Sequence, residues 1–353
     1  MKILVIKTGG TIDSAYNDID KQINVTQRAG SAVAEKYESE HDDCSFEVIN
    51  PLNILSENIS KDDFYTLAKA MYNADLNAYD GVIVTCGSDA LSYISSFLGL
   101  LFWIEKPIMI VCANKISENG RSNGYVNFCA AVELIKLKLC GVFVPYQNSD
   151  ENIYIHSATE ILSANFNDDF YSRTGAYAVL DKTLEFAERI DSNKKPVDKF
   201  YETDKISVGG EICRKNTDWK LIIKTDLVRQ KIKKGVFNKQ NAPYFEKTPL
   251  MINAYPMLDY RKINTDGVPA FLHTLYHSST LDSIKVKDFI KRTGDAPFFI
   301  SPLKKGNALY KSTQDVLKAG AFGLYDISDE CVYIKLCLAL NQNKYSIVKF
   351  MEE

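Results

Sequence analysis

The chain has 353 residues, of which 46% are hydrophobic and 25% are charged, and its formal net charge is −3. This composition is typical of a globular protein, and the length predicts two domains. The slightly acidic balance provides no basic surface of the kind that binds nucleic acid or an anionic membrane, so a small neutral or zwitterionic ligand fits better.

The start of the chain predicts a buried strand that ends in a polar turn. Ile3 to Ile6 are aliphatic without alternation, which is typical of a strand covered on both faces of a parallel sheet. Thr8-Gly-Gly-Thr11 follows directly. Ligands of open α/β sheets bind outside the carboxyl ends of the strands, so Thr8 and Thr11 are predicted to face a ligand crevice. The alternative is a simple tight turn between a strand and a loop.

A second stretch, Asp80 to Leu91, repeats this pattern of an aliphatic strand followed by glycine and hydroxyl residues. Ser88 and Asp89 lie near its end. They also precede an apolar helix expected at 90–104, where a serine cap and an acidic first turn are favoured for structural reasons alone. That helix is too short for a membrane span and contains serines, so we expect it in the core.

The remaining elements alternate between strands and helices, which predicts an α/β fold. Helix 61–74 begins with a capping box formed by Ser60 and Asp63. The expected domains are residues 1–180, a charged and irregular connection at 181–247, and a second α/β unit at 248–353. Further strands are expected at 107–111, 141–145, 250–254, 270–276 and 297–301, and further helices at 126–137, 284–292 and the carboxyl end.

Neither metal nor disulfides are expected. His273 and His277 would share one face of a helix, but 270–276 reads as a strand. The eight cysteines include no Cys-x-x-Cys pair, which favours reduced core thiols in a reducing compartment. The first strand begins at Lys2 without a leader ahead of it, so we expect a cytoplasmic protein.

The two polar turns resemble the two signatures of the bacterial-type L-asparaginase (asparaginase/glutaminase) family, Thr-Gly-Gly-Thr-Ile and His-Gly-Thr-Asp-Thr-Leu. Residues 8–12 match the first signature fully, whereas residues 86–91 keep the glycine, aspartate and leucine but carry Cys86 and Ala90. Ser122-Asn-Gly124 with Asn127 resembles the family's Ser-Asp-Gly...Asn, and residues 319–340 resemble its carboxyl end.

The resemblance implies a larger N-terminal flavodoxin-like domain with a parallel sheet and a smaller C-terminal α/β domain. It also implies hydrolysis of L-asparagine to L-aspartate and ammonia without a cofactor, by a homodimer or homotetramer. Thr11 would be the nucleophile, and Ser88 would position the second hydroxyl and the attacking water. Asp89 would pair with the α-ammonium of the substrate and Ser56 with its α-carboxylate, while Glu57 would face the pocket.

Two positions depart from the family pattern. The family's essential lysine falls at Ile161 or, with a one-residue slip, at Glu160, and the tyrosine of its mobile loop falls at Gln22. Tyr16 in the same loop is the candidate lid residue, and Tyr16 and Lys115 are the first candidates for the lysine's work.

The missing lysine leaves a non-catalytic alternative open, in which a degenerate member binds an amino acid or serves as an assembly partner. A subunit acting on charged transfer RNA is disfavoured, because that branch carries an additional N-terminal domain and retains the lysine. The preference between asparagine and glutamine stays undecided.

Overall fold

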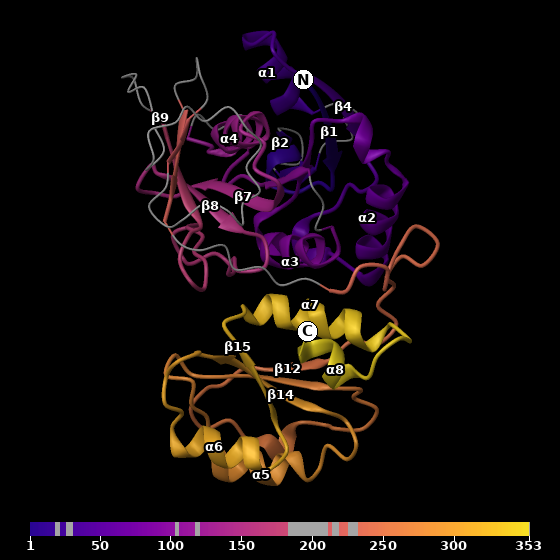
Figure 1. Ribbon diagram of the computed structural model, residues 1–353, viewed down its shortest axis with the longest axis vertical. Coiled ribbons are helices and arrows are strands. Elements are labelled where there is room, and N and C mark those ends of the chain that lie inside the picture. The colour runs from indigo at the N-terminus through magenta and orange to yellow at the C-terminus, as the bar shows by residue number, and fades with distance from the viewer. Residues whose placement is uncertain are drawn as a thin grey trace, which may run out of the picture. The chain divides into compact units, whose positions relative to one another are not determined.

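The computed structural model describes residues 1–17, 22–25, 31–102, 106–116, 121–182, 211–213, 219–224 and 232–352, and it divides into the units Met1–Arg229 and Gln230–Glu353 (Figure 1). Both units combine a sheet with helices, as expected from the alternating pattern of the sequence.

The first unit is built on a sheet with strand order β10-β11-β9-β8-β7-β6-β5-β1-β4. Its strands are β1 (Lys2–Lys7), β4 (Ser45–Ile49), β5 (Gly81–Thr85), β6 (Pro107–Val111), β7 (Gly141–Gln147), β8 (Ile153–Ser157), β9 (Ala178–Lys182), β10 (Glu211–Cys213) and β11 (Trp219–Ile223). Strands β4, β1, β5, β6 and β7 pair in parallel, and the others extend the sheet by antiparallel pairing. The parallel-sheet prediction is therefore confirmed for the part that carries both polar turns.

Helices cover both faces of this parallel region. They are α1 (Ala32–Glu40), α2 (Lys61–Asn73), α3 (Leu91–Leu101) and α4 (Gly124–Lys136), and Figure 1 shows α4 and α3 on opposite sides of the strands. Ile3 and Val5 pack into one buried cluster with residues of α4, such as Phe128. The uninterrupted aliphatic run of β1 is explained by this double coverage, because its residues alternate between two buried faces.

Part of the stretch expected to be an irregular connection forms strands. Residues 211–213 and 219–223 lie in β10 and β11, and β11 pairs with β9. Leu221 and Ile223 are buried in the core of the first unit, which gives this apolar segment a reason to join the sheet. The charged residues around this segment made the sequence resemble an irregular connection. Residues 183–210 lie outside the described part of the chain.

The second unit has a four-stranded parallel sheet in the order β12-β13-β14-β15. Its elements are β12 (Leu250–Ile252), β13 (Phe271–Thr274), α5 (Ser283–Ile290), β14 (Phe298–Leu303), α6 (Lys311–Lys318), β15 (Phe322–Tyr325), α7 (Asp329–Leu340) and α8 (Ile347–Glu352). Figure 1 shows α5 and α6 together on one face of this sheet and α7 and α8 on the other. The four elements predicted here between 250 and 301 are all present.

Within the described residues, no helix combines the length and the apolar character needed to cross a bilayer.

Candidate functional site

Three loops of the first unit meet at the carboxyl ends of β1 and β5. Thr8, which follows β1 directly, donates from its backbone N–H, at 3.0 Å, and from its hydroxyl, at 2.9 Å, to the carbonyl of Thr85. The Gly10 N–H donates to the carbonyl of Ile54 at 2.9 Å. The Thr8–Thr11 turn is thereby fixed both to β5 and to the loop that leads to Ser56.

The glycines are required because the backbones of these loops touch. Gly10 has a φ of 80°, and a Cβ on it would lie 2.2 Å from the Cα of Gly87. A Cβ on Gly87 would in turn lie 2.4 Å from the Ser56 Oγ. No side chain larger than hydrogen fits at either place. The contact brings together the three residues next to or at these points, Thr11, Ser88 and Ser56, from distant parts of the sequence.

The structure joins two of the predicted binding residues directly. The Ser56 hydroxyl, which is buried, lies 3.2 Å from Oδ2 of Asp89 and donates a hydrogen bond to it. Asp89 itself is exposed, Thr11 and Ser88 are partly exposed, and Glu57 is exposed in the same short turn as Ser56. When a carboxylate and a hydroxyl lie side by side, the carboxylate can bind the cationic group of a small zwitterion and the hydroxyl can donate to its anionic group.

The residues at the family-lysine position are enclosed. Ile161 is 0% exposed, and Glu160 is 1% exposed. Ile161 forms an isolated antiparallel bridge with Ser172, which fixes its backbone. The family-lysine position is therefore buried in either alignment, with an aliphatic side chain at 161 or a carboxylate at 160. Lys115, one candidate substitute, is exposed.

The proposed lid lies partly outside the described residues. Residues 14–17 and 22–25 form the hairpin strands β2 (Ser14–Asn17) and β3 (Gln22–Val25), in which Tyr16 pairs with Ile23 and Gln22 with Asn17. The side chains of Tyr16 and Gln22 are not among those described, and neither is the backbone of residues 18–21. The role of Tyr16 stays a prediction.

A neighbouring thiol is a poor competitor for the role of nucleophile. Cys86 directly precedes Gly87, but it is 0% exposed, and burial raises the pKa of its thiol far above the ordinary value. At neutral pH it stays protonated and unreactive. None of the cysteines whose side chains are described forms a disulfide, and the described residues contain no cluster of histidine, cysteine and carboxylate side chains able to hold a metal.

The motif at 122–127 forms hydrogen bonds that hold neighbouring segments of the first unit together. Asn123 exchanges hydrogen bonds with Asn114, its Oδ1 accepting from the Asn114 N–H at 2.9 Å, and its Nδ2 donates to the carbonyl of Gln147. Asn127 accepts from the Gln147 N–H and donates to the carbonyl of Cys112. These side chains tie the ends of β6 and β7 to α4, which is a structural role.

Two charged residues that sequence reasoning missed lie next to the turn that carries Thr11. The Lys7 Nζ and the Asp13 Oδ1 are 3.4 Å apart, and both side chains are buried. A signal was present, because Lys7 ends the aliphatic run of Ile3 to Ile6 two residues before the glycine pair. A buried lysine at such a place requires a carboxylate partner nearby.

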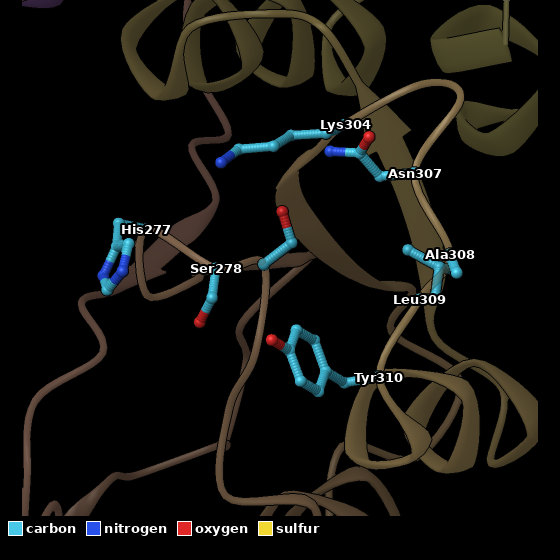
Figure 2. Close-up of a pocket in the computed structure, with 8 residues that line it drawn as sticks. His277, Ser278, Lys304, Asn307, Ala308, Leu309 and Tyr310 are labelled. Carbon is cyan, nitrogen blue, oxygen red and sulfur yellow. The ribbon is translucent and has the colours of Figure 1, made fainter.

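A separate cavity of about 240 Å³ lies in the second unit, at the carboxyl ends of β13 and β14. Figure 2 shows His277 and Ser278 on one of its loops and Lys304, Asn307 and Tyr310 on the other. Most of these side chains are exposed, and the lining includes none of the predicted site residues Thr11, Ser56, Glu57, Ser88 and Asp89. The loops of the first unit therefore remain the candidate site.

Comparisons with known proteins agree with the motifs. The family profile described as "Asparaginase, N-terminal" matches residues 2–182 of the 353. Among curated proteins, a glutamyl-tRNA(Gln) amidotransferase subunit of Archaeoglobus fulgidus is 26% identical over 161 residues, which cover 45% of this chain and 38% of that protein. The corresponding subunit of Methanosarcina barkeri is 29% identical over 163 residues, with the same shares. The matched stretch thus spans well under half the length of these relatives.

Solved structures share the fold over both units. The thermostable L-asparaginase of Thermococcus kodakarensis superposes with a TM-score of 0.68 at 18% identity, covering 100% of this chain and 97% of that one. L-asparaginase I of Vibrio cholerae gives a TM-score of 0.67 at 17% identity, covering 99% and 95%. With an N-terminal profile match over more than half of its length, the chain belongs to the asparaginase family.

Proposed function

We propose that the protein is an amidohydrolase that converts L-asparagine to L-aspartate and ammonia, with Thr11 as the nucleophile. The observation that carries this proposal is the meeting of three loops, in which the backbones of Gly10 and Gly87 touch and Ser56 bonds Asp89. Family membership supports the reaction class.

The proposed reaction has two steps. The Thr11 hydroxyl attacks the side-chain amide carbon, its proton passes to the leaving nitrogen, and the C–N bond breaks to release ammonia and leave an acyl-enzyme. Water, positioned by Ser88, then hydrolyses the ester and regenerates the hydroxyl. A threonine hydroxyl needs a neighbouring proton acceptor and preorganised donors for the oxyanion, which glycine-rich turns supply through backbone N–H groups.

Binding of the substrate is assigned to the second and third loops. Asp89 pairs with the α-ammonium, Ser56 with the α-carboxylate, and Glu57 borders the pocket in the same turn. Tyr16, in the β2–β3 hairpin, is the proposed lid residue that closes over the bound amide. We infer that the chain assembles into a homodimer or homotetramer in the cytoplasm. Light scattering of the purified protein measures the molar mass and so tests the oligomeric state.

Two alternatives have specific support. The lack of a lysine at the family position, which falls at Ile161 or Glu160, favours a member that binds an amino acid without turnover. The names of the curated relatives favour a subunit that supplies ammonia to an amidotransferase. That second role uses the same amide hydrolysis and adds a partner protein.

Ammonia release from L-asparagine and L-glutamine, measured together with calorimetry of L-aspartate binding, separates these functions. Release from L-asparagine by wild type but not by Thr11→Ala supports the proposed hydrolase. Binding of L-aspartate without ammonia from either amide supports the binding protein. Release that prefers L-glutamine favours the amidotransferase subunit. A protein that neither binds L-aspartate nor releases ammonia from either amide would overturn the assignment of the site.

A further inference from the structure

A buried charged cluster lies directly beneath the turn that carries Thr11. Besides the contact of Lys7 with Asp13, the Thr85 hydroxyl donates to the Asp13 Oδ2 at 2.9 Å. Lys7, Asp13 and Thr85 are 1%, 6% and 0% exposed. Burial raises the pKa of the Asp13 carboxyl, while the Lys7 charge and the Thr85 hydroxyl oppose that rise.

Such a cluster calls for an explanation beyond stability. Two charges removed from water lose hydration that their mutual attraction only partly replaces, so well-packed apolar residues usually serve a core as well or better. The Lys7 and Thr85 positions are paired in register on neighbouring strands β1 and β5, where the rest of the register is aliphatic or glycine. The charged group is thus confined to the strand ends that face the site.

The cluster joins the two motifs of the site. Asp13 closes the 3₁₀ turn that begins at Thr11, and its N–H donates to the carbonyl of Gly10. Thr85 is the last residue of β5, the strand that leads into Ser88. On its other side the turn meets the loop that follows β5, through the contact of Gly10 with Gly87. The position of Thr11 is therefore set by the end of β5 and by the loop after it.

We propose that Lys7, Asp13 and Thr85 form a positioning device that holds the Thr11 hydroxyl in register with Ser88 and Asp89. They act through the backbone of the Thr11 turn. The Lys7 charge favours the ionised form of Asp13, which accepts the Thr85 hydroxyl bond without competing as a donor. The part of this inference that concerns turnover rests on the proposed function.

The matched pair Thr85→Val and Thr85→Ser tests the device. Valine keeps the shape of the side chain but removes the donor to Asp13, whereas serine keeps the donor. The kcat for ammonia release is expected to fall about 10–100-fold in Thr85→Val and to stay close to wild type in Thr85→Ser, because small displacements of a nucleophile have effects of this size. L-aspartate affinity, which depends on Ser56 and Asp89, should change little in either variant.

Lys136→Met provides a control for simple destabilisation. Lys136 is another largely buried lysine, 2.6 Å from the Asp43 carboxylate, at the end of α4. Asp43 precedes β4, whose first residue pairs with Lys2, so this ion pair lies at the opposite, amino-terminal edge of the sheet. Its loss should lower the melting temperature without lowering the kcat of the folded protein.

Hydrogen exchange of the backbone amides at residues 10–14 gives a readout that needs no turnover. Faster exchange there in Thr85→Val, but not in Thr85→Ser or Lys136→Met, is expected. If the wild type releases no ammonia, the proposed hydrolase fails, and the exchange result alone decides the positioning role. Unchanged exchange in Thr85→Val, or in Thr85→Ala where the valine variant does not fold, would overturn the inference, as would a kcat that Thr85→Val leaves intact.

Discussion

The Ser56 hydroxyl donates a hydrogen bond of 3.2 Å to the Asp89 carboxylate across 33 residues of sequence. The two residues belong to different short turns, Ser56–Asn58 and Ser88–Ala90, which pack against each other. Neither residue could be placed beside the other from sequence spacing alone. Their contact makes the two proposed ligand groups, for carboxylate and for ammonium, parts of one binding unit.

Because these side chains touch, their contributions to binding should be coupled. Asp89→Asn is expected to weaken L-aspartate binding at least about tenfold, since it leaves the ligand ammonium without a charged partner. In Ser56→Ala/Asp89→Asn the losses should fall short of the sum of the single effects, by about 0.5–3 kcal/mol. Calorimetry on the four proteins measures the cycle. Strictly additive effects, or an Asp89→Asn variant with wild-type affinity, would move the ligand elsewhere.

Thr11→Ala should abolish ammonia release and leave the fold intact. Thr11 is partly exposed and starts a short turn, so we expect its hydroxyl to contribute little to the stability of the fold. Removal of a nucleophile costs many orders of magnitude in kcat. Thr11→Ser, which keeps a hydroxyl, is the matched control. Equal activity in Thr11→Ala and wild type would rule Thr11 out, provided that thermal unfolding confirms a folded variant.

Gly10→Ala and Gly235→Ala separate backbone strain from close approach. Both glycines have nearly the same φ, 80° and 82°, but a Cβ at Gly10 meets Gly87 at 2.2 Å, whereas a Cβ at Gly235 meets nothing within 4 Å. Alanine at a positive φ costs about 1 kcal/mol through strain alone. We expect Gly235→Ala to show only that loss in urea unfolding. Gly10→Ala should lose clearly more stability than Gly235→Ala, and it should also lose ligand binding. Equal losses of stability in the two variants would contradict the contact between the loops.

Lysine at position 161 tests whether the family amine can be restored. Ile161 is fully buried, so Ile161→Lys should lower the free energy of unfolding by about 3–5 kcal/mol unless the amine finds a partner. Ile161→Met, which nearly conserves volume, should cost less than about 1.5 kcal/mol. Ammonia release per folded molecule should rise in Ile161→Lys if the amine reaches Thr11 and Ser88. Glu160→Lys tests the one-residue slip, and no gain in either lysine variant would mean that another group does this work.

Stability should fall on acidification because of a buried histidine. Burial lowers the pKa of His156 from 6.5 to about 3, and its Nδ1 lies 2.8 Å from the Ser172 hydroxyl. The folded protein keeps the ring neutral while the unfolded chain takes up a proton below pH 6.5, so this contribution is full above 6.5 and is lost as the pH falls toward 3. The loss approaches about 1.4 kcal/mol per pH unit for one group.

Urea midpoints at pH 7.5, 5.5 and 4.5 measure this slope. His156→Gln should flatten it, whereas His277→Gln, which changes an exposed ring, should not. Burial also lowers the pKa of His273, to about 4, so part of the slope should remain in His156→Gln. The same slope in His156→Gln as in wild type would show that His156 does not carry the effect.

Much of the fold could be predicted because its signals are local. The uninterrupted aliphatic run of β1, the capping box of Ser60 with Asp63 and the span of β6 all follow from short stretches of sequence. The part of the sheet formed by β10 and β11 could not be predicted. β11 joins the sheet by pairing with β9, which begins before the charged segment. Within that segment the charged residues favoured an irregular connection over a strand.

Residues of the candidate site could be proposed from the sequence, whereas the buried groups that hold their loops could not. Glycine and hydroxyl patterns pointed to Thr11 and Ser88, whose loops the structure brings together through Gly10 and Gly87. The pairing of Lys7 with Asp13 depends on how the chain turns after β1, so no spacing rule identifies it. Likewise, the burial of Ile161 is a property of the surrounding core rather than of its neighbours in sequence.

The place of β1 between two strands that follow it in the chain has a consequence for synthesis on the ribosome. β1 pairs with β4 on one side and with β5 on the other, and Thr8 bonds Thr85, which follows 77 residues later. At about 5–20 residues per second, roughly 4–15 s pass between the synthesis of these two residues. During that time the edge of β1 that pairs with β5 has no strand partner, although β4 can already pair with its other edge. The turn that carries Thr11 is thus synthesised before its partner strand β5, and its hydrogen bonds with Thr85 form only after β5 has emerged.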